Sequence, residues 1–476
     1  MSRDAADLTE ASELETPDVE EDLEDLALGE DYALNPEFVD MVVDAADRGD
    51  AERLRELLGA LRPADVADLM GFLSAEYRDE VLAHLDPEGL AEILSELDPE
   101  IREEVLEAVA PATLAKALEE LDSDDAVDVV DDLEADKRAQ VLAAMPETER
   151  TAIETSLAYR DDSAGRLMQR EVVAAPQFWT VGQAIDHFRR EGEDLPELFF
   201  DVYVVDPTYK PVGAAPVSRL LRTRRDVPLA QIMEPVTEIP VDMDQEEVAY
   251  IFDKYHLISA PVVERGGRLV GQITVDDIVG VIHEESEEDI LALAGVSDAG
   301  RNADVVDMVR SRLPWLLINT LTAATSASVI RAFEGEITKL VTLAMLMPIV
   351  ASLGGNAGTQ TLAVAVRALA SRELSAYNAL RTVGREILVG VLNGAALALV
   401  TGAAIYLMFH DPRLSITFGL ALVINFFMAA LAGALVPLAL ERFGRDPAVS
   451  SAVFVTFVTD FTGFFSFLGL AALLLL

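Results

Sequence analysis

The chain has 476 residues, enough for several domains, and a formal net charge of −48 at pH 7. We do not expect so acidic a protein to bind nucleic acid, because contacts to the phosphate backbone require Lys and Arg. The sequence has no Cys, which excludes disulfides, thiolate metal sites and cysteine catalysis.

The charge is distributed unevenly along the chain. Residues 313–476 hold 9 Lys and Arg against 8 Asp and Glu, whereas residues 1–312 hold 27 and 76. The first part is therefore expected to be an acidic soluble protein and the second a membrane protein. Two explanations of the acidic part stay open. One is hydration of the surface in a high-salt cytoplasm, and the other is binding of divalent cations, which prefer oxygen ligands.

Residues 1–35 are predicted to form a disordered acidic tail. Residues 1–32 contain 13 acidic residues and one Arg, and such a composition cannot bury enough apolar surface to fold. The tail also lacks the apolar core of a signal peptide, so we expect the N-terminus to stay in the cytoplasm.

A twelve-residue repeat begins at Leu61 and predicts a helical solenoid over residues 36–160. The first repeats read LRPADVADLM, LSAEYRDEVL, LDPEGLAEIL and LDPEIREEVL, and an eighth begins at Met145. In LDPE the Asp is the expected N-cap of a helix, and the Pro is its first residue, where a missing N–H costs nothing. Short helices stacked in this way form a scaffold or interaction module.

Residues 161–285 contain a duplicated α/β unit. LFFDVYVVDPTYKPVGAAPVSRLL aligns with HLISAPVVERGGRLVGQITVDDIV, so Val205 and Gly213 correspond to Val263 and Gly271, both 58 residues later. Each copy is predicted to contain a strand, a turn, a second strand and a helix, with a further helix before them.

This duplicated unit resembles a tandem pair of CBS domains, which associate into a compact disc and often bind adenine nucleotides. Thr274 and Asp277 in the GQITVDD stretch keep the spacing of that family's ribose-binding signature. The first copy has Pro216 and Arg219 instead, so the resemblance implies a single nucleotide site, with ATP as a regulator.

Residues 286–312 are predicted to form a connecting helix that leads to a membrane domain at 313–476. Arg residues concentrate in 366–386 and 441–446, so the positive-inside rule predicts a cytoplasmic N-terminus and an extracellular C-terminus. The apolar segments long enough to cross a bilayer lie at about 313–331, 338–365, 387–409, 414–440 and 447–476.

Two features of these spans indicate an ion path. Asp460 is the one charged residue of the last span, at a depth where a charge costs about 2.5–3.5 kcal/mol on insertion scales. It is expected to face an aqueous path, and an interhelical hydrogen bond is the alternative. In the second span Pro348, the glycines and Asn356 of PIVASLGGNAGTQ predict an interrupted helix that lines a cavity. Close packing at the glycines is the alternative there.

A helical superhelix, tandem CBS domains, a connecting helix and five spans, in this order, resemble the MgtE family of magnesium channels. The most specific matches are PIVASLGGNAGTQ, the RALASREL that follows it, and VTDFTGFFSFLGLA in the last span. The resemblance implies a mostly α-helical, multidomain protein of the cell membrane that is not an enzyme. It further implies a homodimer in membrane lipid, with a magnesium pore on its two-fold axis.

The resemblance also assigns roles to individual residues. Asp460 would bind hydrated Mg²⁺ in the pore, and Asn356 would line the path with Gly354, Gly355 and Gly358. Internal magnesium would close the pore by binding to ligands in the cytosolic part. The matching acids are Asp124, Glu246, Asp277, Glu285, Glu288 and Asp289.

Two positions depart from the family pattern. Gly280 stands where the family has a carboxylate, and Ala452-Val453 stand where an Asn-Pro usually precedes the acid of the last span. An ion-coupled secondary transporter of divalent cations, with Asp460 as a relay, stays the alternative function. The sequence does not separate Mg²⁺ from Co²⁺ or Mn²⁺ as the transported ion.

Overall fold

The structure of the protein is a computed structural model. It divides the chain into two compact units, residues 1–278 and 279–476. Most of the predicted tail lies outside the described residues, but its described part includes Leu23, Ala27 and Leu34, which are buried in the core of the solenoid, so this part is not a disordered tail. The predicted domain boundaries stay predictions. The residues that the structure describes are 23, 26–29, 32–192, 195–196, 198–294, 296, 305–370, 372, 379–443 and 451–476.

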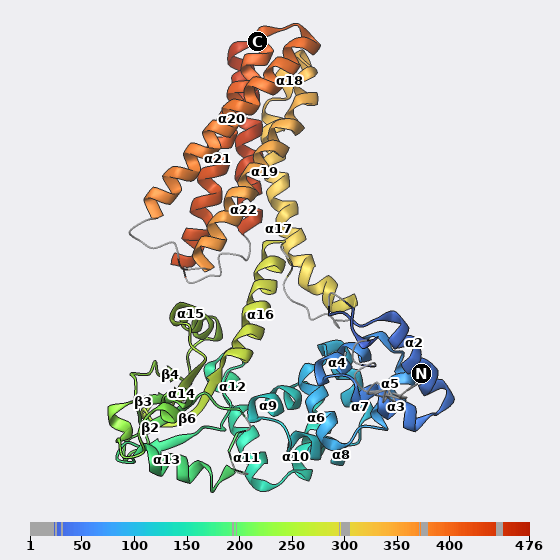
Figure 1. Cartoon of the computed structure of the whole chain (residues 1–476). Helices are drawn as coiled ribbons and strands as arrows, with labels where there is room; N and C mark the ends of the chain where they lie inside the picture. The colour runs from blue at the N-terminus through green and yellow to red at the C-terminus, as the bar shows by residue number, and fades with distance from the viewer. Residues whose placement is uncertain are drawn as a thin grey trace, which may run out of the picture. The chain divides into compact units, whose positions relative to one another are not determined.

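The first unit opens with the predicted helical solenoid (Figure 1). From α4 to α11 each helix begins twelve residues after the one before it, which confirms the repeat. Alternate helices pack together, α4 on α6, α6 on α8 and α8 on α10. The helices are α2 (Pro36–Arg48), α3 (Ala51–Gly59), α4 (Pro63–Phe72), α5 (Ala75–Leu82), α6 (Pro87–Glu96), α7 (Pro99–Ala108), α8 (Pro111–Leu118), α9 (Ser123–Asp131), α10 (Ala135–Ala144) and α11 (Glu147–Ser156).

The two LDPE stretches of the solenoid differ at their caps. Asp86 accepts a hydrogen bond from the Gly89 N–H at 2.9 Å, as predicted for an N-cap, whereas Asp98 makes no side-chain cap bond. The buried Arg102 of α7 pairs with Asp128 and Asp132 at 2.8 and 2.6 Å, which ties α7 to α9. The cap stabilises the start of one helix, whereas the ion pairs of Arg102 hold two helices of the solenoid together.

The rest of the first unit contains two small sheets of the same topology, β1-β2-β3 and β4-β5-β6. In each sheet the first two strands are parallel and the last two antiparallel. Val204 pairs with Gly213 and Val262 with Gly271, and each pair is followed by a shift of register, so the duplication is confirmed. The strands are β1 (Ala174–Pro176), β2 (Asp201–Val205), β3 (Pro211–Pro216), β4 (Ile239–Pro240), β5 (Ser259–Val263) and β6 (Leu269–Thr274).

Short helices accompany these strands. They are α12 (Ala164–Leu167), α13 (Val181–Phe188), α14 (Val217–Arg222), η2 (Leu229–Gln231) and α15 (Gln245–Tyr255). A longer helix, α16 (Val275–Leu293), follows β6 directly and contains the division between the two units.

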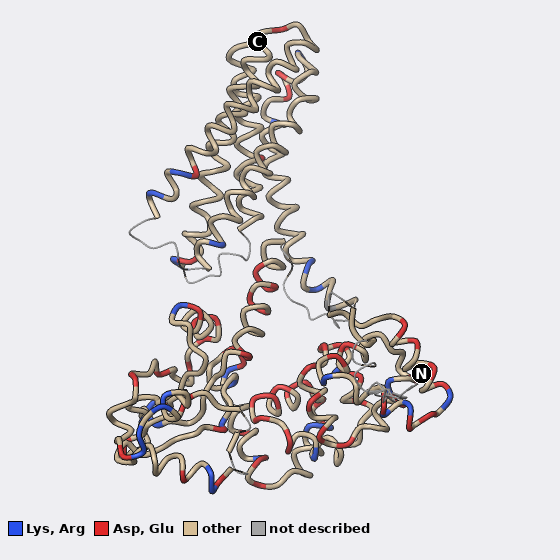
Figure 2. Tube along the Cα trace, in the orientation of Figure 1, with Lys and Arg blue, Asp and Glu red and all other residues tan. Residues whose placement is uncertain are grey.

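The second unit is a bundle of long apolar helices. Its α21 packs against α19, α20 and α22, and α17 packs on α22. Figure 2 shows few charged residues along the middle of these helices, as a membrane domain requires. The helices are α17 (Val305–Ala332), the short α18 (Glu334–Lys339), α19 (Thr342–Ala370), α20 (Ala379–Phe409), α21 (Pro412–Arg442) and α22 (Ser451–Leu474).

Helices occur at all five predicted membrane segments. Among the described residues, four of them are long and apolar enough to cross a membrane, namely Met308–Ala332, Ala379–Phe409, Pro412–Arg442 and Ser451–Leu474. The other predicted span is α19, which has 29 residues and carries the polar stretch around Asn356. The predicted fold class, a mostly α-helical multidomain membrane protein, is confirmed.

The predicted interruption of the second span is wrong. α19 is one continuous helix that contains Pro348 and the glycines. The alternative, close packing, explains the glycines, because a Cβ at Gly358 would lie 2.5 Å from Val455 Cγ1 of α22. A Cβ at Gly433 of α21 would likewise lie 2.7 Å from the Gly358 carbonyl oxygen. Small residues therefore let three membrane helices approach closely without breaking any of them.

Candidate functional site

Asp460 lies on α22 where this helix crosses α19. A Cβ added at Gly355 would lie 4.0 Å from Thr459 Oγ1, so these two residues mark the crossing. Asn356 directly follows Gly355, and Asp460 directly follows Thr459. Both predicted metal-binding residues of the membrane domain are therefore next in the sequence to residues at this crossing.

The side chains at this crossing differ in exposure within one chain. Asp460 is half-buried, and within the described residues its carboxylate has no hydrogen bond and no ion pair. Asn356 is exposed, whereas Gly354 and Gly358 are buried between helices. The exposed part of this face is available to water or to a second copy of the chain. The pore-lining role of the glycines stays a prediction.

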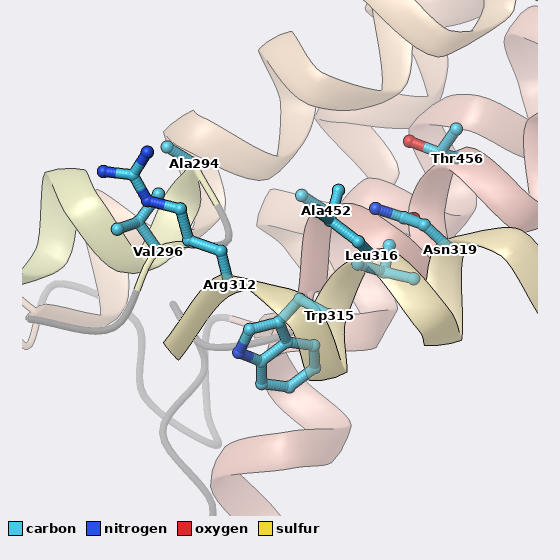
Figure 3. A pocket seen from close by; sticks show the side chains of 9 residues that line it. Ala294, Val296, Arg312, Trp315, Leu316, Asn319, Ala452 and Thr456 are labelled. Atoms are coloured by element: carbon cyan, nitrogen blue, oxygen red, sulfur yellow. The ribbon is translucent and has the colours of Figure 1, made fainter. Parts of the chain in front are cut away.

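A pocket of about 220 Å³ lies between the segment after α16 and the helices α17 and α22 (Figure 3). Arg312 and Trp315 line one part of it, and Asn319 of α17 and Thr456 of α22 line another. Thr456 precedes Asp460 by about one helical turn, so it lies on the same face of α22. Asn319 and Thr456 were not among the residues predicted from the sequence, since neither carries a charge that would distinguish it within its helix.

A second candidate site lies in the first unit, where the solenoid meets the CBS pair. The N–H and Oγ of Ser123, at the start of α9, donate to Glu171 Oε2 at 3.3 and 2.8 Å. Gln272 of β6 donates from Nε2 to the Glu171 carbonyl oxygen at 2.8 Å. Asp124 follows Ser123, and Asp277 lies in the first turn of the helix after β6. These bonds hold the two predicted metal ligands in the same region of the unit.

The carboxylates at this place are half-buried, and their raised pKa values indicate that they lie close to one another. Burial, followed by repulsion from Asp277, raises the pKa of Asp124 well above its ordinary value. The same two causes raise the pKa of Asp125 to about 7. Burial raises the pKa of Asp277 to about 6, although a hydrogen bond from Thr274 lowers it. Buried carboxylates of this kind are stabilised by a proton or by a cation between them.

Asp125 was not among the predicted ligands. The available signal was the run of acids at residues 122–125, which lies at the start of a repeat helix. Sequence alone did not separate Asp125 from the many other acids of the solenoid.

The role of the other predicted sensor ligands stays a prediction. Glu246 lies in the first turn of α15 and its side chain is exposed. Glu285, Glu288 and Asp289 belong to the second unit and share one face of α16. In the part of the chain that is described, no three Asp, Glu or His residues are grouped closely enough to hold a metal ion.

The predicted nucleotide-binding residues contact each other. The Thr274 Oγ1 and N–H donate to Asp277 Oδ2 at 2.8 and 3.4 Å, which caps the start of α16. In the first copy Arg219 occupies the place of Asp277, and it pairs with Glu234 and donates to the Ile232 carbonyl oxygen. Only the second copy therefore presents a carboxylate where the ribose-binding signature requires one.

A helical scaffold, a CBS pair and a bundle of apolar helices with a half-buried carboxylate are the features of a multidomain membrane protein with CBS domains. Family models match three parts of the chain: an MgtE intracellular N domain at 61–162, a CBS domain at 229–284 and a divalent cation transporter at 347–470.

Sequence similarity to known proteins identifies the family of the chain. The magnesium transporter MgtE of Thermus thermophilus is 35% identical over 337 residues, 68% of this chain and 73% of that protein. MgtE of Enterococcus faecalis is 33% identical over 322 residues, 67% and 71% of the two chains. The chain belongs to the MgtE family of magnesium transporters, so the resemblance drawn from the sequence is confirmed. The chain is also similar to a solved structure of the cytosolic domain of the Mg²⁺ channel MgtE in complex with ATP. The sequence identity is 34%, the match covers 51% of this chain and 99% of the solved chain, and the TM-score is 0.49.

Proposed function

We propose that the protein is a channel for Mg²⁺ in the cell membrane and that Mg²⁺ bound to its cytosolic part closes it. The observation that carries the proposal is the carboxylate of Asp460, which has no partner within the described residues and lies at the α19–α22 crossing. A charge at this depth is costly unless it faces an ion or water.

The chemistry of magnesium fits a carboxylate in this position. Mg²⁺ demands octahedral oxygen coordination and gives up its water reluctantly, so a pore that binds the hydrated ion avoids the cost of dehydration. Two Asp460 carboxylates related by a two-fold axis would hold that ion by charge and by hydrogen bonds to its water. Asn356 and the neighbouring Gly354, Gly355 and Gly358 would line the same path. The proposal therefore includes a homodimer, with cytoplasmic N-termini and extracellular C-termini.

The sensor is proposed to begin at Asp124 and Asp277, with Asp125 beside them. Their raised pKa values support a cation between solenoid and CBS pair, since a divalent ion removes the repulsion that burial strengthens. Glu246, and Glu285, Glu288 and Asp289 on α16, are proposed as further ligands. ATP is proposed to bind at Thr274 and Asp277, so nucleotide and cation would share the Asp277 carboxylate.

Magnesium flux into liposomes that contain the purified protein tests this function. A channel should pass Mg²⁺ down its own gradient at the same rate with and without an imposed sodium or proton gradient. A rate that depends on either gradient would support the alternative, an ion-coupled transporter with Asp460 as relay. Flux of Co²⁺ and Mn²⁺ in the same vesicles measures selectivity.

A further inference from the structure

Asn425 is a fully buried amide in the middle of the apolar helix α21. Its Nδ2 donates to the Val350 carbonyl oxygen of α19 at 2.9 Å. The carbonyl can only accept a hydrogen bond, so this contact fixes which end of the amide faces α19. The side chain is thereby held in one orientation between α21 and α19.

Two glycines leave the room that this amide occupies. A Cβ added at Gly354 of α19 would lie 2.0 Å from Asn425 Nδ2, and one at Gly463 of α22 would lie 2.9 Å from the same atom. Any side chain at Gly354 would therefore have to displace the amide. Asn425 fills the space among α19, α21 and α22 that these glycines provide.

The other end of the amide is not used by the bundle. Asn425 Oδ1 is buried and has no hydrogen-bond partner among the described residues. An apolar side chain of the same shape would fill the space without leaving a buried acceptor unpaired. An unpaired buried acceptor in a membrane bundle lowers stability, so the presence of Asn425 indicates a role beyond the packing of the helices.

The amide contacts α19 at Gly354 and α22 at Gly463, and these two glycines lie close in the sequence to Asn356 and Asp460. Gly354 precedes Asn356 by two residues, and Gly463 follows Asp460 by three. Because the amide separates the backbones at Gly354 and Gly463, its size and its bond to Val350 set the spacing of the two helices there. That spacing determines how far apart the side chains of Asn356 and Asp460 lie.

We propose that Asn425 is a positioning residue of the ion path, which holds α19 against α22 so that Asn356 and Asp460 face a hydrated cation at a fixed distance. The inference rests on the proposed channel function and names a residue outside the predicted site. A residue that only joined helices would change the amount of folded protein. A positioning residue changes the affinity and selectivity of each folded molecule.

The test is magnesium flux in liposomes, per folded molecule, for Asn425→Ala, Gly354→Ala and the double variant. Asn425→Ala should lower flux about tenfold, raise the half-saturating Mg²⁺ concentration and weaken the preference for Mg²⁺ over Ca²⁺. Gly354→Ala should do the same by displacing the amide. The double variant should recover part of the loss of Gly354→Ala, because the clash is then gone. Gly384→Ala in α20 is the control, since a Cβ there meets no atom within 4 Å.

The outcomes separate this inference from the channel function. If the unaltered protein passes no Mg²⁺, the channel function fails. If it conducts, while folded Asn425→Ala keeps the same half-saturation and selectivity, the positioning role is wrong. Should Asn425→Ala not fold, Gly463→Ala displaces the amide without removing it and should give the same shifts. Failure of all these variants to fold would also overturn the inference, since Asn425 would then serve packing alone.

Discussion

At the scale of single residues, the carboxylates of Asp124, Asp125 and Asp277 make metal-free stability depend on pH. Burial raises the pKa of Asp125 to about 7 and of Asp277 to about 6, against about 3.9 in an unfolded chain. A carboxyl group with a raised pKa stabilises the folded protein when it is protonated. Its contribution to the free energy of unfolding is therefore fully present below about pH 4 and is lost as the pH rises to about 7. We expect a lower thermal midpoint in EDTA at pH 8 than at pH 5.

The Asp125→Asn variant isolates this effect from the other acids of the chain. It removes one half-buried charge, so it should raise the metal-free thermal midpoint at pH 8 and change it little at pH 5. Magnesium should stabilise the unaltered protein more at pH 8 than at pH 5, since the carboxylates are then ionised. The same difference in metal-free thermal midpoint between the unaltered protein and Asp125→Asn at both pH values would contradict this prediction.

At the scale of elements, the two LDPE stretches provide a matched pair for helix capping. Asp86→Ala removes the bond to the Gly89 N–H and should cost about 1 kcal/mol of stability. Asp98→Ala removes an identical residue that makes no such bond and should cost less. Denaturant unfolding followed by circular dichroism measures both. Equal losses would show that the cap at Asp86 does not contribute to stability.

The helices of the solenoid were predictable from the sequence because local patterns determine them. The spacing of apolar residues and the Pro at the first helical position depend on no distant contact, and the helix starts follow the repeat. The cap at Asp98 was not predictable, because the sequence LDPE is the same as at Asp86. Its geometry is decided by how each repeat packs on its neighbours.

The course of α19 could not be decided from sequence for a similar reason. Glycines allow a helix to break and also allow neighbours to approach, and only the neighbours distinguish the two. Val455 fills the space over Gly358, and Asn425 fills the space over Gly354. Val455 and Asn425 lie far from this stretch in the sequence, so the pattern PIVASLGGNAGTQ alone does not predict these contacts.

At the scale of the whole molecule, the candidate sensor predicts a specific response to magnesium. Neutralising Glu285 and Glu288 of α16 should weaken magnesium-dependent protection of residues 278–312 from protease. Neutralising the exposed Glu103 and Glu119 of the solenoid removes the same charge without removing a proposed ligand. Their variants should keep the protection, since exposed charges interact weakly at high ionic strength. Equal loss in both pairs would mean that diffuse charge, and no specific ligation, produces the response.

The central claim is that Asp460 binds the permeating ion, and magnesium flux through Asp460→Asn protein in liposomes tests it most directly. One carboxylate about 4 Å from a single positive charge contributes about 4 kcal/mol at an effective dielectric constant of 20, so its loss should lower flux by about a hundredfold or more. The variant should insert and elute like the unaltered protein, because the Asp460 carboxylate makes no hydrogen bond or ion pair within the described residues. Normal flux through correctly folded Asp460→Asn protein would contradict the account.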